Sequence, residues 1–209
     1  IVSCNFKIKK NLALELNKSF LEVIIANGFD SDAQKILKAK KNLRLIDGTN
    51  YSLSHFLKFV SYNQDILVQS EDLDQFSNKN FKVVSKRKPT TNQLNNLIFA
   101  FNICRFVKSN AIVLASNKTT VGIGSGQPSR LDSCKIAIKK MKNSKINIDN
   151  LVAASDAFFP FKDSIEKLVQ SGVRAVVQPS GSIRDKEIIN YANETDTVLL
   201  FSRTRHFRH

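Results

Sequence analysis

The chain has 209 residues, 42% of them hydrophobic, which is enough to bury the core of one large domain or two small ones. Its 32 Lys and Arg residues exceed its 18 Asp and Glu residues, and the net charge of +14 attracts polyanions such as nucleic acids, phosphorylated metabolites or anionic membrane surfaces. No run of about eighteen apolar residues occurs, which excludes a membrane-spanning helix.

The first 46 residues alternate between short apolar strands and weak helices. Residues 1–6 predict a strand, and because no Met precedes it, we expect a processed start or a fragment. Further elements of this kind are predicted at 10–19 and 30–40 for helices, and at 23–26 and 43–46 for strands.

Residues 47–80 are polar and weakly patterned, with one strand signal at 66–68. Such a segment is typical of a peripheral insertion or a short hairpin with long loops. We place a domain boundary after it, which divides the chain into residues 1–88 and 89–209.

The second half has stronger signals. Apolar spacing and capping patterns predict helices at 90–107, 129–142, 163–171 and 182–193. Short β-branched runs predict strands at 111–115, 120–123, 151–154, 174–177 and 198–201. From residue 151 the strands alternate with helices, which indicates parallel neighbours, whereas 111–124 has the form of an antiparallel hairpin. The fold class is therefore α/β, in α/β/α layers around a mixed sheet.

The chain's three cysteines, Cys4, Cys104 and Cys134, form no Cys-x-x-Cys pair, and the three histidines do not stand near them at metal-ligand spacing. We therefore expect no metal site, and buried or half-buried thiols in a reducing, cytoplasmic compartment.

Three segments follow a predicted strand and lead into a predicted helix, the form in which α/β proteins bind ligands and helix N-termini bind anions. The first, residues 122–130 (GIGSGQPSR), has three alternating glycines that permit a tight turn and a close approach to a ligand. Arg130 follows, and its fork of donors suits a carboxamide or phosphate. For the glycines alone, a hairpin exit followed by a helix cap is the favoured explanation.

The second segment, residues 155–163 (SDAFFPFKD), holds three phenylalanines and two aspartates in a loop. This combination suits a flat heteroaromatic ligand, although one or two of the rings are expected to plug the core. The third, residues 178–185 (QPSGSIRD), presents backbone donors or forms an ordinary capped turn. The last residues, 203–209, form either a frayed tail, a tag or a tucked segment whose arginines bind phosphate.

Together the segments 108–113, 122–130, 155–163, 178–185 and 205–209 resemble the bifunctional purine-biosynthesis enzymes, in which a formyltransferase is joined to an inosine monophosphate cyclohydrolase. The resemblance runs in order from residue 1 to 209 and is most specific from 108 onward. It implies two cytidine-deaminase-like units, the end of the first in 1–88 and the whole second in 89–209. It also implies a homodimer with shared active sites.

The resemblance further implies a reaction, formyl transfer from 10-formyltetrahydrofolate to aminoimidazole carboxamide ribotide. We expect neither a membrane nor nucleic acid as a partner of this reaction. By their match to the family's motifs, Asn110 and His209 would act in catalysis. The residues that would bind the ribotide are Arg130, Phe158, Arg205 and Phe207. Others would line the folate side: Pro160, Phe161, Asp163, Ser180 and Gly181.

The family's Lys-His pair, which assists the proton transfers, does not occur in this chain. We therefore expect the isolated chain to be a C-terminal fragment that is inactive or very slow. Two alternatives stay open. The first is a non-enzymatic basic module that binds nucleic acid, and the second is a complete, diverged enzyme whose base is His209 or another residue.

Overall fold

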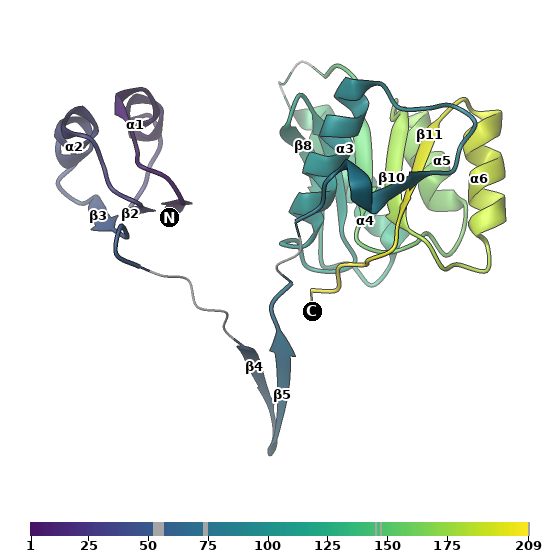
Figure 1. Cartoon of the computed structure of the whole chain (residues 1–209), viewed down its shortest axis with the longest axis horizontal. Helices are drawn as coiled ribbons and strands as arrows, with labels where there is room; N and C mark the ends of the chain where they lie inside the picture. The colour runs from purple at the N-terminus through teal and green to yellow at the C-terminus, as the bar shows by residue number, and fades with distance from the viewer. Residues whose placement is uncertain (52–56, 73–74, 145, 147, 209) are drawn as a thin grey trace. The chain divides into compact units, whose positions relative to one another are not determined.

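The structure is a computed structural model that describes residues 1–51, 57–72, 75–144, 146 and 148–208. The chain forms two compact units, Ile1–Glu71 and Asp72–His209 (Figure 1). Each unit has its own sheet and is described by itself.

The first unit contains a three-stranded parallel sheet with the order β1-β2-β3. Its elements are β1 (Val2–Cys4), α1 (Lys10–Asn17), β2 (Val23–Ala26), α2 (Ser31–Lys38) and β3 (Arg44–Asp47). Its core is small, and Ile8, Ile24 and Leu37 are its largest fully buried side chains. Asp30 caps α2 by accepting the Ala33 N–H at 2.7 Å. The predicted strands and helices of this half are confirmed.

A hairpin of β4 (Leu57–Tyr62) and β5 (Asp65–Ser70) follows, and all of its residues are exposed. The hairpin predicted within 47–80 is confirmed, although the pattern indicated only its second strand. The first unit ends at Glu71, whereas the predicted domain boundary lies at 88/89. The reason for the difference is β6 (Phe81–Val83), which pairs with β11 and so belongs to the second unit's sheet. The assignment of residues 1–88 and 89–209 to two cytidine-deaminase-like units stays a prediction.

The second unit contains a six-stranded mixed sheet with the order β6-β11-β10-β9-β7-β8. In addition to β6, its strands are β7 (Ile112–Ser116), β8 (Thr119–Gly124), β9 (Val152–Ser155), β10 (Ala175–Pro179) and β11 (Val198–Ser202). Strands β9, β10 and β11 are parallel neighbours, whereas β7 runs antiparallel to both β8 and β9. The predicted mixed sheet is confirmed.

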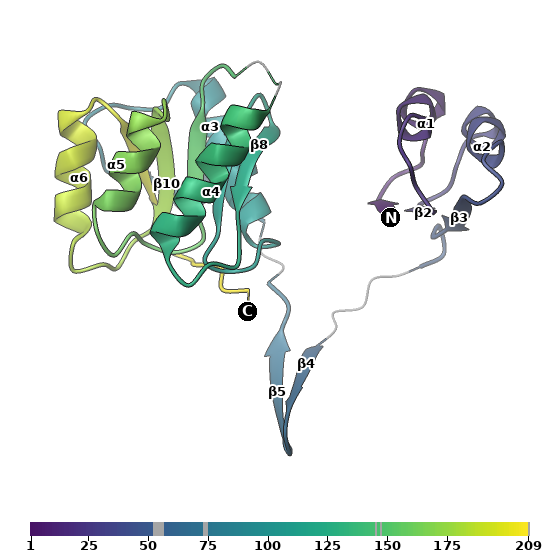
Figure 2. The same cartoon turned by 180° about the vertical axis from the view of Figure 1, so that it is seen from behind.

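Helices cover both faces of this sheet (Figures 1 and 2). They are α3 (Thr91–Cys104), α4 (Arg130–Asn143), α5 (Asp163–Gln170) and α6 (Asp185–Glu194). In β9, Val152 and Ala154 belong to the core cluster that contains α3 residues, while Ala153 belongs to the cluster that contains residues of the other three helices. Because successive strand residues face opposite sides, the predicted α/β/α layers follow from fully apolar strands.

Two of the three alternating glycines serve packing. A Cβ on Gly122 would lie 2.1 Å from the Ala137 carbonyl oxygen, and one on Gly124 would lie 1.9 Å from that of Ser133. Strand β8 therefore needs glycine so that the backbone of α4 can pack against it. For these two glycines the structure agrees with the favoured interpretation, a hairpin exit followed by a helix. Gly126 alone lies in the loop, with φ +66°.

Helix α6 begins at Asp185 rather than at the predicted residue 182. The backbone before it is a turn, because Gly181 has φ +116° and the Ser182 hydroxyl accepts the Arg184 N–H at 3.1 Å. The capping box predicted at Thr90 and Gln93 is present at the start of α3.

Candidate active site

The five segments of the sequence analysis meet at one edge of the second sheet. Strands β8 to β11 end at this edge and β7 begins there, because β7 alone of these five runs in the opposite direction. The last described residues run along the same edge (Figure 1). This is the edge at which α/β sheets bind ligands.

Arg130 connects three of these segments. Its Nη2 donates to Asn110 Oδ1 at 2.7 Å and to Asp156 Oδ1 at 3.0 Å, and its Nη1 donates to the Phe158 carbonyl oxygen at 3.2 Å. The Arg130 residue is 9% exposed and Asp156 is fully buried. The structure thus brings together Asn110, Arg130 and Phe158, which the resemblance assigned to one ligand.

Hydrogen bonds fix both the side chain and the main chain of Asn110. Its Nδ2 donates to the main-chain carbonyl oxygens of Gln127 at 2.9 Å and Pro128 at 3.1 Å. The main-chain carbonyl oxygen of Asn110 accepts a hydrogen bond from the Ser133 hydroxyl at 2.7 Å. Both amide hydrogens are used and Arg130 binds Oδ1, so the amide has one orientation. Among the described residues Oδ1 has no second partner, and one of its lone pairs is therefore available. Asn110 can therefore accept a hydrogen bond from a ligand but has no side-chain donor left for it.

Asp156 is one of the two loop aspartates that the sequence analysis counted as suiting a ligand, whereas the structure buries it completely against Arg130 and Ser109. Its Oδ2 accepts a short hydrogen bond from the Ser109 hydroxyl, and its backbone N–H donates to the Ala111 carbonyl oxygen at 3.2 Å. Its position directly after a fully buried strand was the available signal, since a buried carboxylate needs a charged or hydrogen-bonding partner.

The three phenylalanines of the loop have different environments. Phe159 is fully buried in the core, and its N–H donates to Gln178 Oε1 at 3.1 Å. Phe158 is half-buried beside Arg130, and Phe161 is 52% exposed with the Arg184 guanidinium 4.8 Å from its ring centre. The expectation that one or two rings plug the core, but not all three, is confirmed.

The residues predicted for the folate side are open to solvent or half-buried. Pro160, Ser180 and Gly181 are exposed, and Asp163 is half-buried as the first residue of α5. The Ser180 N–H donates to the Ser202 carbonyl oxygen at 3.0 Å, and the Gly181 N–H donates to Asp185 Oδ2 at 2.8 Å.

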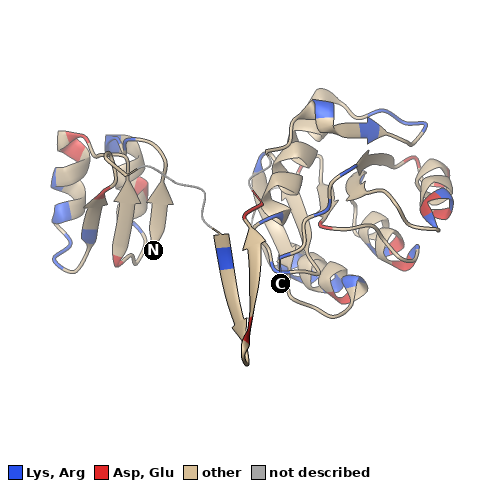
Figure 3. Ribbon diagram, turned by 60° about the horizontal axis from the view of Figure 1, so that its bottom comes forward, with Lys and Arg blue, Asp and Glu red and all other residues tan. Residues whose placement is uncertain are grey.

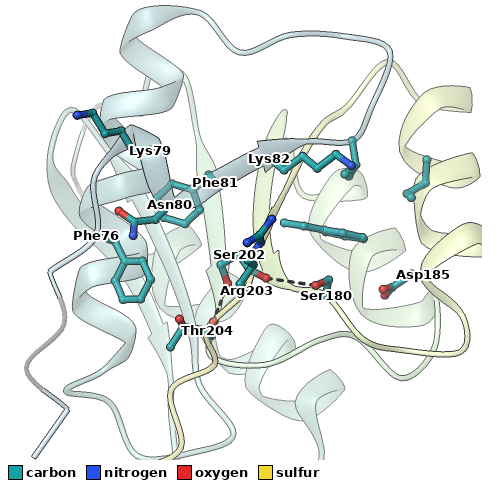
Figure 4. A pocket seen from close by; sticks show the side chains of 13 residues that line it. Phe76, Lys79, Asn80, Phe81, Lys82, Ser180, Asp185, Ser202, Arg203 and Thr204 are labelled. Atoms are coloured by element: carbon teal, nitrogen blue, oxygen red, sulfur yellow. Dashed lines mark hydrogen bonds between the residues drawn. The ribbon is translucent and has the colours of Figure 1, made fainter.

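A pocket of about 940 Å³ adjoins Ser180 (Figure 4). Strand β6, the end of β11 and the start of α6 line it, and Lys82 and Arg203 supply positive charge to its wall. Asn110 and Arg130 do not line it. The pocket therefore lies on the β6 side of the residues predicted for the folate and is separate from the hydrogen bonds around Arg130.

The last described residues are extended and only partly buried. His206 is 1% exposed, whereas Arg205, Phe207 and Arg208 are exposed, and the Arg205 guanidinium lies 5.0 Å from the Phe207 ring centre. The predicted tucked segment is thus confirmed for His206, while Arg205 and Phe207 face outward. His209, the second predicted catalytic residue, lies outside the described residues.

The distribution of charge, the length of the helices and the burial of the cysteines were also considered in the sequence analysis. Lys and Arg residues are spread over both units rather than gathered on one element (Figure 3). No helix in the described part of the chain is long and apolar enough to cross a membrane. Cys104 and Cys134 are buried and Cys4 is half-buried, as expected. Burial raises the pKa of the Cys134 thiol to about 12 and that of Cys104 well above its ordinary value.

Comparison with known proteins gives one consistent result. A protein-family model described as "AICARFT/IMPCHase bienzyme" matches residues 1–140. Proteins named "Bifunctional purine biosynthesis protein PurH" align over the whole chain, with 41% identity for Polynucleobacter asymbioticus, 44% for Buchnera aphidicola and 45% for Leuconostoc mesenteroides. The chain spans only 40–41% of the length of these relatives.

Among solved structures, a dCMP deaminase from the cyanophage S-TIM5 aligns with a TM-score of 0.37 and 16% identity. The alignment covers 54% of this chain and 98% of the deaminase. A likeness of this size carries no argument about the fold.

Proposed function

The chain belongs to the AICARFT/IMPCHase bienzyme family, and on this premise we propose that it supplies part of a formyltransferase site. The reaction passes a formyl group from 10-formyltetrahydrofolate to aminoimidazole carboxamide ribotide in purine biosynthesis. A homodimer with shared sites is part of the same proposal.

The amine of the ribotide is a poor nucleophile, because the neighbouring carboxamide withdraws its electron density. In the transfer, the amine nitrogen bonds to the formyl carbon, the bond from that carbon to folate N10 breaks, and N10 takes up a proton. A base must accept the proton that the amine loses, and both reactants must be held close together. We propose that residues outside this chain supply the base.

The arrangement of Asn110 is the observation that carries the proposal. Its one available lone pair lies on Oδ1, next to Arg130 Nη2 at 2.7 Å. An acceptor in this position orients an N–H of the amine and so directs the nitrogen lone pair at the formyl carbon. The amide cannot turn away, because its two hydrogens are bound to Gln127 and Pro128.

Arg130 acts mainly through its neighbours. Three of its five N–H hydrogens are used by Asn110, Asp156 and Phe158. The Nε hydrogen has no partner in the described residues, but it is buried and a ligand cannot reach it. The second hydrogen of Nη1 is therefore the donor best placed for a carboxamide oxygen. In this proposal Arg130 fixes Asn110 and the Phe158 loop, and Phe158 supplies a ring beside the imidazole.

The exposed loops take the other ligand groups in this proposal. Phe161 presents an exposed ring for a pterin, with Pro160 beside it, and Asp163 offers a carboxylate to pterin N–H groups. Ser180 and Gly181 complete the folate side. At the end of the chain, Arg205 binds the ribotide phosphate, while Phe207 and His209 close the site.

A formyl-transfer assay tests the proposal. Tetrahydrofolate formation is followed for the 209-residue chain and for a polypeptide of the relatives' length, with intact mass checked for both. We expect turnover from the longer polypeptide only. In it, Asn110→Ala lowers kcat by about 100-fold, because a misplaced reactant costs about this factor. The control, Asn190→Ala, changes an exposed residue of α6 and leaves kcat unchanged.

Two results would contradict it. Turnover by the 209-residue chain alone would mean that the base lies within this chain. Absence of turnover from both polypeptides, with the ribotide and folate present, would reject the formyltransferase function.

A further inference from the structure

The proposed chemistry gives no role to the buried side chain of His206. This residue lies in the middle of the tail, residues 203–208. Its Nδ1 is hydrogen-bonded to Asp72 Oδ2, and its ring packs against Phe76 and Phe101, with centroids 5.0 and 4.7 Å away. A histidine from the end of the chain is therefore paired with the first carboxylate of the second unit.

Main-chain bonds connect the tail to the hydrogen bonds around Arg130. The His206 N–H donates to the Asp156 carbonyl oxygen at 2.9 Å, and the Ser109 N–H donates to the Arg208 carbonyl oxygen at 2.9 Å. Ser109 and Asp156 are also joined through their side chains. The tail is therefore fixed on both sides of Phe207 to residues that hold Arg130 and precede Asn110.

The tail side chains alternate in direction. His206 is buried, whereas Arg205 and Phe207 on either side of it are exposed. In an extended segment, neighbouring side chains point to opposite faces. Holding His206 inward therefore holds Arg205 and Phe207 outward at the edge of the sheet, where Arg205 lies 5.0 Å from the Phe207 ring centre.

We infer that Asp72 and His206 form an anchor that positions Arg205 and Phe207 for the ribotide. Both anchor residues are positioning residues, because they act on the ribotide through Arg205 and Phe207. The inference rests on the proposed function, in which Arg205 binds the phosphate. A tail that is already ordered does not have to be ordered when the ligand binds, so the anchor raises affinity for the ribotide.

Asp72 allows this role to be separated from simple core filling. Removing the His206 ring would leave a cavity beside Phe76 and Phe101, so a loss of function there would be ambiguous. The Asp72 side chain is 34% exposed, and its truncation removes the hydrogen bond while the aromatic contacts of His206 stay.

The experiment measures the KM for ribotide and for folate separately, in the polypeptide of the relatives' length. Asp72→Ala raises the ribotide KM about tenfold, the effect of losing one hydrogen bond to a charged group, and leaves kcat and the folate KM unchanged. The triple variant Asp72→Ala/Arg205→Ala/Phe207→Ala binds ribotide no more weakly than Arg205→Ala/Phe207→Ala, because Asp72 acts through these two residues. The control Asp196→Ala, which breaks an exposed ion pair with Arg87, changes neither KM.

A second measurement does not depend on turnover. Trypsin cleaves after Arg205 and Arg208 faster in Asp72→Ala than in the native protein, and calorimetry gives the ribotide Kd directly. If no polypeptide transfers formyl groups, the proposed function fails, while the Kd and the cleavage rate still decide the anchor. An unchanged ribotide affinity in Asp72→Ala overturns the inference, and so does weaker ribotide binding by the triple variant than by Arg205→Ala/Phe207→Ala.

Discussion

Arg130 Nη2 lies 3.0 Å from Asp156 Oδ1, and the two side chains are 9% and 0% exposed. Among the ion pairs of the described residues, this is the one with both members buried. It joins the end of β9 to the start of α4, and the residues proposed for the ribotide gather around it.

Removing the charge of Asp156 leaves a buried guanidinium without its counter-ion. Asp156→Asn therefore lowers the free energy of unfolding by about 3–5 kcal/mol, as measured by urea denaturation. The control is Asp132→Asn, which removes the carboxylate of an exposed pair with Lys135 at the same distance of 3.0 Å. Exposed pairs contribute less than about 1 kcal/mol, so equal effects of the two variants would contradict the buried role.

Phe159 and Phe161 differ in burial, so truncating each in turn separates a role in the core from a role in ligand binding. Phe159→Ala destabilises the second unit by about 3–5 kcal/mol, because Phe159 is fully buried. Phe161→Ala costs less than about 1 kcal/mol, since its ring is half exposed, but raises the KM for folate. Thermal melting and steady-state kinetics on the same samples check both expectations. A folate KM that is unchanged in Phe161→Ala removes this ring from the proposed folate side.

Contact between β8 and α4 requires glycine. In Gly124→Ala, the new methyl carbon would lie 1.9 Å from the Ser133 carbonyl oxygen, and backbone cannot move aside as a side chain can. We expect a loss of more than about 3 kcal/mol in the free energy of unfolding, at the upper end for overpacking. Gly126→Ala is the matched control in the same segment. Its φ of +66° is strained for alanine, but its nearest neighbour is a Lys108 side-chain carbon at 3.6 Å, so the loss stays at about 1–2 kcal/mol.

The buried thiols give the second unit a dependence on alkaline pH. Burial raises the pKa of Cys134 to about 12, whereas an unfolded cysteine ionises near about 8.5. The folded state therefore holds a proton that the unfolded state has lost, and stability falls as pH rises above about 8.5 towards 12. Each such thiol contributes a slope of about 1.4 kcal/mol per pH unit. Urea denaturation between pH 8 and 10 measures it, and Cys134→Ala has a shallower slope than the native protein.

The sequence by itself determined the layers and the edge at which the site lies. The predicted strand 151–154 (LVAA) is apolar at every position, and a strand of this kind needs helices on both faces. The alternation of strands and helices after residue 151 required parallel neighbours, whose carboxyl ends share one edge. The loops that follow them were therefore candidates for ligand binding before any contact was known.

The tertiary structure decided the partners within that site. The order of β7 beside β9 brings Ser109 to Asp156, and the sheet order cannot be calculated from the pattern of either strand. The pairing of Asp72 with His206 spans 134 residues, so no local signal indicates it. Local patterns report which faces of a strand or helix are buried, whereas a buried carboxylate or imidazole depends on the single partner that the complete fold places beside it.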